Sequence, residues 1–147
     1  PDIAYMMEQE GFLFRRDRRN EELVTIQPRG RAGDPPERWN WDSPIMVSPH
    51  QPSRVYFGSQ RIWRSDDRGD RWTAISPDLT QNANRNDIVT MGLKGTDINI
   101  SRNDGISQWP TIVNMAESPK QVGVYYTGTD DGTPDSVYSM VTDLSGC

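Results

Sequence analysis

The sequence of 147 residues contains one cysteine, Cys147, and one histidine, His50. A single cysteine excludes a disulfide within the chain and a cysteine-rich zinc site, and a single histidine excludes a histidine-based metal cluster. No apolar run approaches the roughly 18 residues that a membrane-spanning helix needs. No basic, apolar leader is recognisable at the start of the sequence. We therefore expect no cofactor, no metal ion and no membrane span.

The sequence also lacks a large excess of charge of either sign. The 16 basic and 21 acidic residues leave a net charge of −5, and most of the excess acidity lies in residues 86–147. Four arginines cluster in residues 15–19, but Glu21 and Glu22 follow them at once. Because a phosphate-binding surface needs a basic face, we expect no nucleic-acid partner and interpret the cluster as the solvated tip of a hairpin.

Turn-forming residues and large aromatic side chains are abundant, with 12 Gly, 11 Pro, 5 Trp and 5 Tyr. Short runs of β-branched and aromatic residues recur along the chain, each bounded by Gly, Pro, Asn, Asp or Ser. No apolar stripe at helical spacing persists for about ten residues. The predicted strands are residues 3–7, 11–14, 22–26, 44–47, 54–58, 61–65 and 72–75. The pattern predicts an all-β fold.

These strands recur as a unit. Residues 2–26 and 54–75 both show strand, tight link, strand, polar turn and strand, and a third copy begins at residues 123–132. Residues 43–49 and 110–119 resemble each other and would add a further strand that ends in a Ser-Pro turn. Each unit would then hold four antiparallel strands, which is the content of a propeller blade.

The alignment of these units makes Tyr5, Tyr56 and Tyr125 equivalent. The interval between the second and third of these tyrosines is longer than that between the first two, and we assign the excess to an insertion at residues 77–105. The fold class predicted from the repeat is a partial β-propeller of about two to three four-stranded blades.

The turn at residues 65–72 fits the pattern Ser-x-Asp-x-Gly-x-x-Trp, the Asp-box. Asp67 is a short acceptor for backbone N–H groups of its own loop, and Gly69 permits a positive φ where the chain reverses. Ser65 offers another local hydrogen bond, and Trp72 is expected to start the next strand and fold back beneath the turn. We interpret these four residues as groups that stabilise the turn and not as catalytic groups.

Residues 1–132 resemble the BNR-repeat (Asp-box) β-propellers of the sortilin (VPS10) N-terminal-like kind. The segments that carry the resemblance are residues 38–44, 48–50, 55–58, 65–72, 75–80, 101–105, 116–119 and 128–132. The resemblance implies a propeller fragment, because a whole propeller has typically about 4–8 blades. It also implies a secreted or periplasmic parent family, some of whose members are regarded as glycosyl hydrolases.

The predicted organisation follows from this resemblance. The partial propeller covers residues 1–132, with blade parts at about 1–28, 39–76 and 98–132. Residues 133–147 depart from the family pattern and form an atypical tail.

The candidate ligand-binding residues are Trp39, Trp41, Asp42 and Trp109, since indole faces stack on sugar rings and a carboxylate binds hydroxyls. The alternative is that the indoles fill the core of a blade or the space between blades. Glycosidases need two carboxyl groups about 5–9.5 Å apart. The acidic residues available for such a pair are Asp42, Asp97, Asp104, Asp130 and Asp131. No catalytic residue is assigned, and residues 130–132 are interpreted as a hairpin turn.

Three functions stay open. The first is a non-catalytic binding or assembly module with a glycan or protein ligand. The second is a fragment of a glycoside hydrolase-like protein that is active only when oligomerised, and the third is a relic that folds without a selected activity.

Two to three blades would leave two blade faces uncovered, so we expect a homodimer that completes or caps the propeller. The side chains expected on these faces are Tyr5, Phe12, Phe14, Val55, Phe57, Trp63 and Tyr125.

Overall fold

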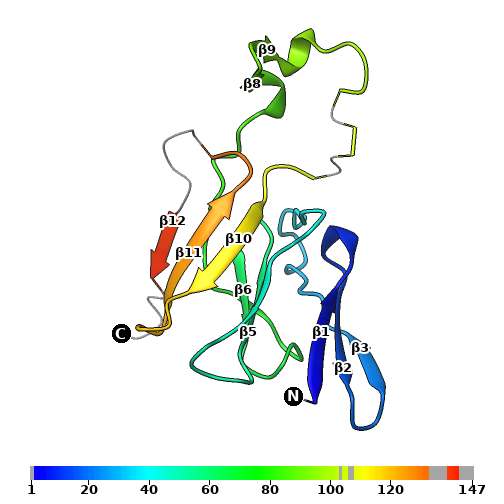
Figure 1. Cartoon of the computed structure of the whole chain (residues 1–147), viewed down its shortest axis with the longest axis vertical. Coiled ribbons are helices and arrows are strands. Elements are labelled where there is room, and N and C mark those ends of the chain that lie inside the picture. The colour runs from blue at the N-terminus through cyan, green and yellow to red at the C-terminus, as the bar shows by residue number, and fades with distance from the viewer. Residues whose placement is uncertain (1, 103, 106–107, 133–138, 143–147) are drawn as a thin grey trace.

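The computed structural model describes residues 2–102, 104–105, 108–132 and 139–142. Within these residues the regular elements are strands and three short 3-10 helices, and there is no α-helix. The strands form three sheets of three or four strands and one two-stranded ribbon, none of which closes on itself (Figure 1). The fold is therefore all-β, built from small antiparallel sheets.

The first sheet consists of β1 (Ile3–Met7), β2 (Leu13–Asp17) and β3 (Glu22–Thr25) in sequential antiparallel order. β1 and β3 lie where the sequence predicts them, but β2 begins two residues after the start of the predicted strand. The cause is a short 3-10 helix, η1 (Gln9–Gly11), that ends at a glycine with a φ of 78°. The arginine cluster is thus not confined to a hairpin tip, because Arg15 and Arg16 belong to β2.

The second sheet contains four sequential antiparallel strands, as the repeat unit predicts. They are β4 (Ile45–Val47), β5 (Val55–Gly58), β6 (Ile62–Ser65) and β7 (Thr73–Ala74). All four strands lie within one residue of the predicted boundaries.

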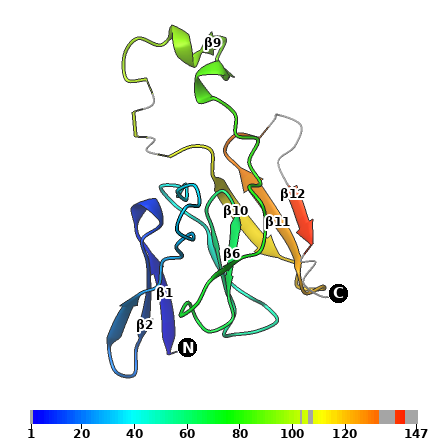
Figure 2. The same cartoon turned by 180° about the vertical axis from the view of Figure 1, so that it is seen from behind.

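The third sheet contains β10 (Ile112–Glu117), β11 (Val124–Thr129) and β12 (Ser139–Thr142). β12 is the described part of the predicted tail, and the rest of that tail lies outside the described residues. The insertion holds η2 (Arg85–Asp87), β8 (Val89–Thr90), β9 (Leu93–Lys94) and η3 (Gly95–Asp97). It projects beyond the three sheets in Figures 1 and 2.

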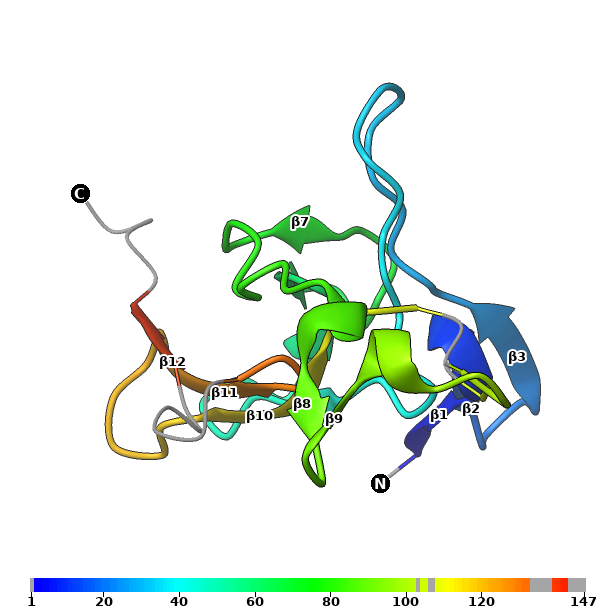
Figure 3. The same ribbon diagram turned by 90° about the horizontal axis from the view of Figure 1, so that it is seen from above.

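The second sheet lies between the other two (Figures 1 and 3). Its side chains alternate between two faces, as the period of a β-strand requires. One face contributes Phe57 and Trp63 to a first core, completed by Leu13, Ile26 and Trp39. The other contributes Tyr56 and Ile62 to a second core, completed by Ile112, Met115 and Tyr125. The three sheets are therefore stacked face to face.

Backbone hydrogen bonds recur at equivalent places in the first and second sheets. In each sheet, one N–H in the turn after the second-last strand and one just after the last strand donate to carbonyl groups of the preceding chain. The pairs are Arg18 N to Asp2 O (2.8 Å) and Arg68 N to Ser53 O (2.9 Å), then Ile26 N to Leu13 O (2.8 Å) and Ile75 N to Ile62 O (2.9 Å). Strands β1 to β3 are thus the counterparts of β5 to β7.

A second set of hydrogen bonds aligns the second and third sheets. Ser48 N donates to Arg54 O over 2.9 Å, and Ser118 N donates to Val124 O over 2.8 Å, each in a Ser-Pro turn. Arg54 and Val124 are therefore equivalent, and the counterpart of Tyr56 is Tyr126. The expected equivalence of Tyr56 with Tyr125 is wrong by one residue, a shift that exchanges the two faces of a strand.

Candidate functional site

The turn at residues 65–72 is held by the side chains of Ser65 and Asp67. The buried Ser65 hydroxyl donates to Asp67 Oδ1 over 2.8 Å and accepts from the Gly69 N–H over 2.7 Å. Asp67 also accepts from the Arg71 backbone and side chain, each over 2.9 Å. The hydrogen bonds from Arg71 hold the pKa of the Asp67 carboxyl at about 2. These contacts keep both side chains within the turn.

The same turn joins the first and second sheets. Trp72 does not start β7, which begins one residue later, but its indole Nε1 donates to Ile26 O of the first sheet over 2.6 Å. Gly69 is buried at a φ of 96°, and a Cβ there would overlap the side chain of Ile26. Gly69 and Trp72 therefore pack the turn against the first sheet.

We expect Ser65→Ala to lower the free energy of unfolding by about 1–3 kcal/mol, because the buried Gly69 N–H loses its partner. Asp67→Ala should cost less, since the Asp67 side chain is 31% exposed and water replaces part of what it loses. Chemical denaturation of both variants measures the difference. A larger loss for Asp67→Ala would show that the carboxylate, and not the hydroxyl, stabilises the turn.

The structure places Trp39 in the core. Only 6% of its surface is exposed, and its ring stacks on Phe57 with a centroid distance of 4.8 Å. Gly11 lies so close to the indole that a Cβ there would overlap it. Trp39 is therefore a core residue, as the alternative interpretation predicts, and its ring presents no face to a ligand.

Trp41 and Asp42 lie at the surface, apart from Trp39. Trp41 is 48% exposed and borders a shallow hollow together with Asp42. The hollow is otherwise lined by Phe12 and by residues 7–10, which include Glu8 and Glu10. Its lining is therefore acidic and open, with two exposed aromatic rings.

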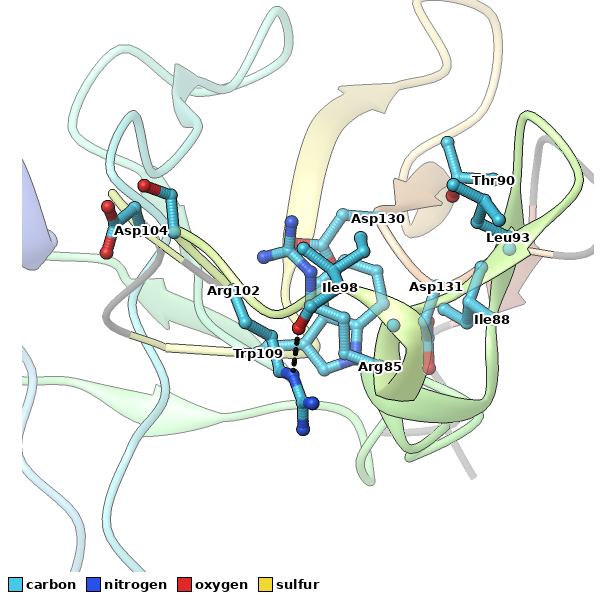
Figure 4. Close-up of a pocket in the computed structure, with 13 residues that line it drawn as sticks. Arg85, Ile88, Thr90, Leu93, Ile98, Arg102, Asp104, Trp109, Asp130 and Asp131 are labelled. Carbon is cyan, nitrogen blue, oxygen red and sulfur yellow. Dashed lines mark hydrogen bonds between the residues drawn. The ribbon is translucent and has the colours of Figure 1, made fainter.

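Trp109 belongs to a different pocket, between the insertion and the end of β11 (Figure 4). The four candidate ligand residues are thus distributed over three places and do not form one site. Trp109 Nε1 donates to Ala83 O over 2.9 Å, and the Arg85 guanidinium lies 5.5 Å from the centre of the indole. The insertion therefore packs over Trp109 through this hydrogen bond and this cation–π contact, neither of which could be predicted from the sequence.

Two adjacent aspartates close the other side of this pocket. Asp130 accepts from Thr111 N over 2.7 Å, from Thr111 Oγ1 over 2.8 Å and from Asn40 Nδ2 over 3.3 Å. Burial raises the pKa of Asp130, although the hydrogen bonds from Thr111 act in the opposite direction. Asp131 is only 5% exposed, and its Oδ2 accepts from Ala83 N over 3.2 Å. Asp130 thus binds the residue before β10 and Asn40, whereas Asp131 binds the insertion.

Within the part of the chain that the structure describes, no group of three or more His, Cys, Asp or Glu side chains is arranged to hold a metal ion. The described segments also include no helix with the length and apolar character needed to cross a membrane. Comparisons of the chain with protein-family models, curated proteins and solved structures return no match. The resemblance to BNR-repeat propellers therefore stays a prediction.

Proposed function

We propose that the chain is a non-catalytic assembly module, a fragment of a propeller-like stack whose end sheets pair with those of a second copy. The observation that carries the proposal is the contrast between Tyr56 and its counterpart Tyr126. Tyr56 is fully buried beneath the third sheet, whereas 43% of the Tyr126 surface is exposed. Tyr126 occupies the position at which the next sheet of a stack would pack.

The first sheet has the complementary open face. Its residues Met6, Phe14 and Leu23 are the counterparts of Phe57, Trp63 and Trp72, which the second sheet packs against the first. Met6 is 40% exposed and Leu23 is 57% exposed. The open face of the first sheet thus corresponds to the face of the second sheet that packs on the sheet before it. The open face of the third sheet corresponds to the face of the second sheet that packs on the sheet after it.

A second copy of the chain supplies both missing faces. The first sheet of one copy would cover the third sheet of the other, as the second sheet already covers the first. Two copies hold six sheets of three or four strands, within the range of about 4–8 blades that close a propeller. A head-to-tail contact of this kind gives a closed ring when the rotation between copies permits it.

The open faces differ from the expected ones. Of the seven side chains expected there, only Phe14 lies on an open sheet face. Tyr5 packs against the first core and Phe12 borders the hollow beside Trp41. The other four are buried within the stack: Val55, Phe57, Trp63 and Tyr125. The expectation was wrong for Tyr125 because the third sheet is shifted by one residue, which leaves Tyr126 on the open face. It was wrong for Val55, Phe57 and Trp63 because the second sheet lies between the other two.

The hydrolase alternative depends on the three aspartates that line the Trp109 pocket, Asp104, Asp130 and Asp131. Asp130 already accepts hydrogen bonds from Thr111 and Asn40, and these favour a structural role. Release of reducing sugars from oligosaccharides by the dimeric protein would support the hydrolase instead.

The stacking register predicts a specific cross-link. Tyr56 contacts Tyr125 of the next sheet, with ring centroids 5.1 Å apart, and the counterpart of Tyr125 in the first sheet is Ala4. In a Cys147→Ser background, we expect Tyr126→Cys and Ala4→Cys proteins to form a mixed disulfide on oxidation when combined. Non-reducing electrophoresis measures the product.

The single-cysteine proteins provide the control for this cross-link. Each alone should give no dimer band, because a head-to-tail contact does not bring identical positions together. Efficient self-cross-linking of Tyr126→Cys would indicate a face-to-face dimer and contradict the proposed arrangement.

A further inference from the structure

The first sheet has one strand fewer than the second. Strands β1 to β3 are the counterparts of β5 to β7, whereas β4, which pairs with β5, has no counterpart among the described residues. In the third sheet, β10 holds the same place beside β11. β1 is therefore an edge strand at the position where the second and third sheets carry one more strand (Figure 1).

The register of β1 shows which backbone groups its outer edge presents. Two hydrogen bonds of 2.8 Å, Arg18 N to Asp2 O and Glu8 N to Phe12 O, continue the ladder between β1 and β2 at its two ends. Hydrogen-bonded pairs recur at every second residue of an antiparallel ladder, so the even-numbered residues of β1 are bonded to β2. The N–H and C=O groups of residues 3, 5 and 7 therefore point to the outer edge, where no described strand pairs with them.

The composition of β1 leaves this edge open to pairing. Natural edge strands usually carry charged residues, prolines or bulges that prevent pairing with another chain. β1 is five residues long and contains neither a charged residue nor a proline, and its ladder with β2 has no register shift. By contrast, β3 at the opposite edge of the same sheet begins with Glu22. β1 thus has the features of a strand that accepts a further strand.

Two hollows lie along β1, one near each of its ends. The first hollow is lined by residues 2, 3 and 5 and by Val47 and Pro52. The second is the hollow beside Trp41, which is lined by residues 7–10 and by Asp42. Each is bordered by β1 or its ends on one side and by residues 41–52, which contain β4, on another. There is therefore open space along β1 on the side of the second sheet.

We infer that the outer edge of β1 binds an extended segment of a partner protein as an additional antiparallel strand. The central residue of the segment lies opposite Tyr5, as Met46 of β4 lies opposite Tyr56. This residue is apolar, because Tyr5 packs against the first core and directly opposed side chains share one face of a sheet. The described strands of a second copy are engaged in sheets of their own, so the occupant is another polypeptide. The edge is separate from the open sheet faces, and the inference does not depend on the proposed assembly.

The charges at the two ends of β1 determine the composition of the segment. The first hollow is lined by two arginines and one aspartate, and the second by three carboxylates and no basic side chain. These residues are Arg19, Arg68 and Asp2 at the start of β1, and Glu8, Glu10 and Asp42 at its end. Because an antiparallel segment begins at the end of β1, its first residues meet the carboxylates and its last residues meet the arginines. The segment that fits is basic, then apolar, then acidic.

The test is a titration of the full chain with the peptide acetyl-Lys-Lys-Ile-Met-Val-Glu-Glu-amide, with amide hydrogen exchange measured by NMR. At a peptide concentration about ten times its dissociation constant, exchange of the Tyr5 N–H should slow about tenfold, because the bound strand protects this group. Exchange at Ala4 and Met6 should change little, since their N–H groups already bond to β2. Tyr126→Asp protein should respond in the same way, which separates this test from that of the dimer. Unprotected Tyr5 at millimolar peptide would overturn the inference.

Two altered peptides test the backbone contact and the direction of the strand. Methylation of the central methionine nitrogen removes the N–H that donates to Tyr5 O, and it should abolish the protection. A peptide with its lysines and glutamates exchanged should bind about tenfold more weakly, because both of its ends meet like charges. Equal protection by the methylated peptide would rule out an added strand, and equal affinity of the exchanged peptide would contradict the proposed direction.

A matched pair of variants locates the bound peptide on the chain. Glu8→Lys should weaken binding of the original peptide about threefold or more, because a lysine then faces the basic end of the peptide. Glu22→Lys makes the same change of charge at the opposite edge of the first sheet and should leave the affinity unchanged. Both side chains are exposed, so neither substitution disturbs the core. Equal weakening by the two variants would contradict the placement at β1.

Discussion

Tyr56→Ala is expected to lower the free energy of unfolding by about 3–5 kcal/mol, whereas Tyr126→Ala should change it by less than about 1 kcal/mol. Tyr56 is fully buried, and its hydroxyl lies 3.0 Å from that of Tyr125 and 3.1 Å from Glu117 Oε1. Its removal leaves a cavity between the second and third sheets and unpaired groups around it. Tyr126 occupies the equivalent position, and no further sheet covers it within the described residues.

Denaturant unfolding at protein concentrations low enough to keep the chain monomeric measures both values. Under these conditions any contribution of Tyr126 to the proposed interface does not enter the comparison. Similar losses for the two variants would show that the two tyrosines are not counterparts in a stack of sheets.

The second large effect is on association. Tyr126→Asp should abolish dimer formation at micromolar concentration, because it places a carboxylate in the centre of the proposed apolar contact, where burial of an unpaired charge is costly. The folded monomer should keep its stability, since the position is exposed there. Sedimentation velocity measures the loss.

Met91→Asp is the matched control for Tyr126→Asp. Met91 is 99% exposed in the ribbon formed by β8 and β9, which projects away from the three sheets (Figure 1). The control removes an apolar side chain and adds the same charge, but it should leave the dimer intact. Dissociation by Met91→Asp, or a dimer that survives Tyr126→Asp, would contradict the assignment of the interface.

The strands of the second sheet could be predicted from the sequence within one residue, because each is short, apolar and bounded by turn-forming residues. The start of β2 could not, since it depends on how Gly11 fits beneath the indole of Trp39, a contact distant in sequence. The register of the third sheet was missed for a related reason. Val124, Tyr125 and Tyr126 match the second unit almost equally well in either of two alignments, and the hydrogen bond in the Ser-Pro turn decides between them.

The residues of the candidate site were harder to predict from the sequence than the strands. Trp39 and Trp41 are close in sequence, but one ring enters the core while the other faces solvent, and no local pattern distinguishes them. Arg85 comes from a polar, asparagine-rich segment that is typical of a solvated loop. It reaches the Trp109 pocket only because the insertion folds back over the Trp109 indole.

The molar mass of the purified chain in solution tests the central claim most directly. Light scattering at micromolar concentration should give twice 16.7 kDa for the natural sequence, and the mass of one chain for Tyr126→Asp. A mass of 16.7 kDa for the natural sequence, with no increase on concentration, would contradict the proposal that the two open sheet faces pair.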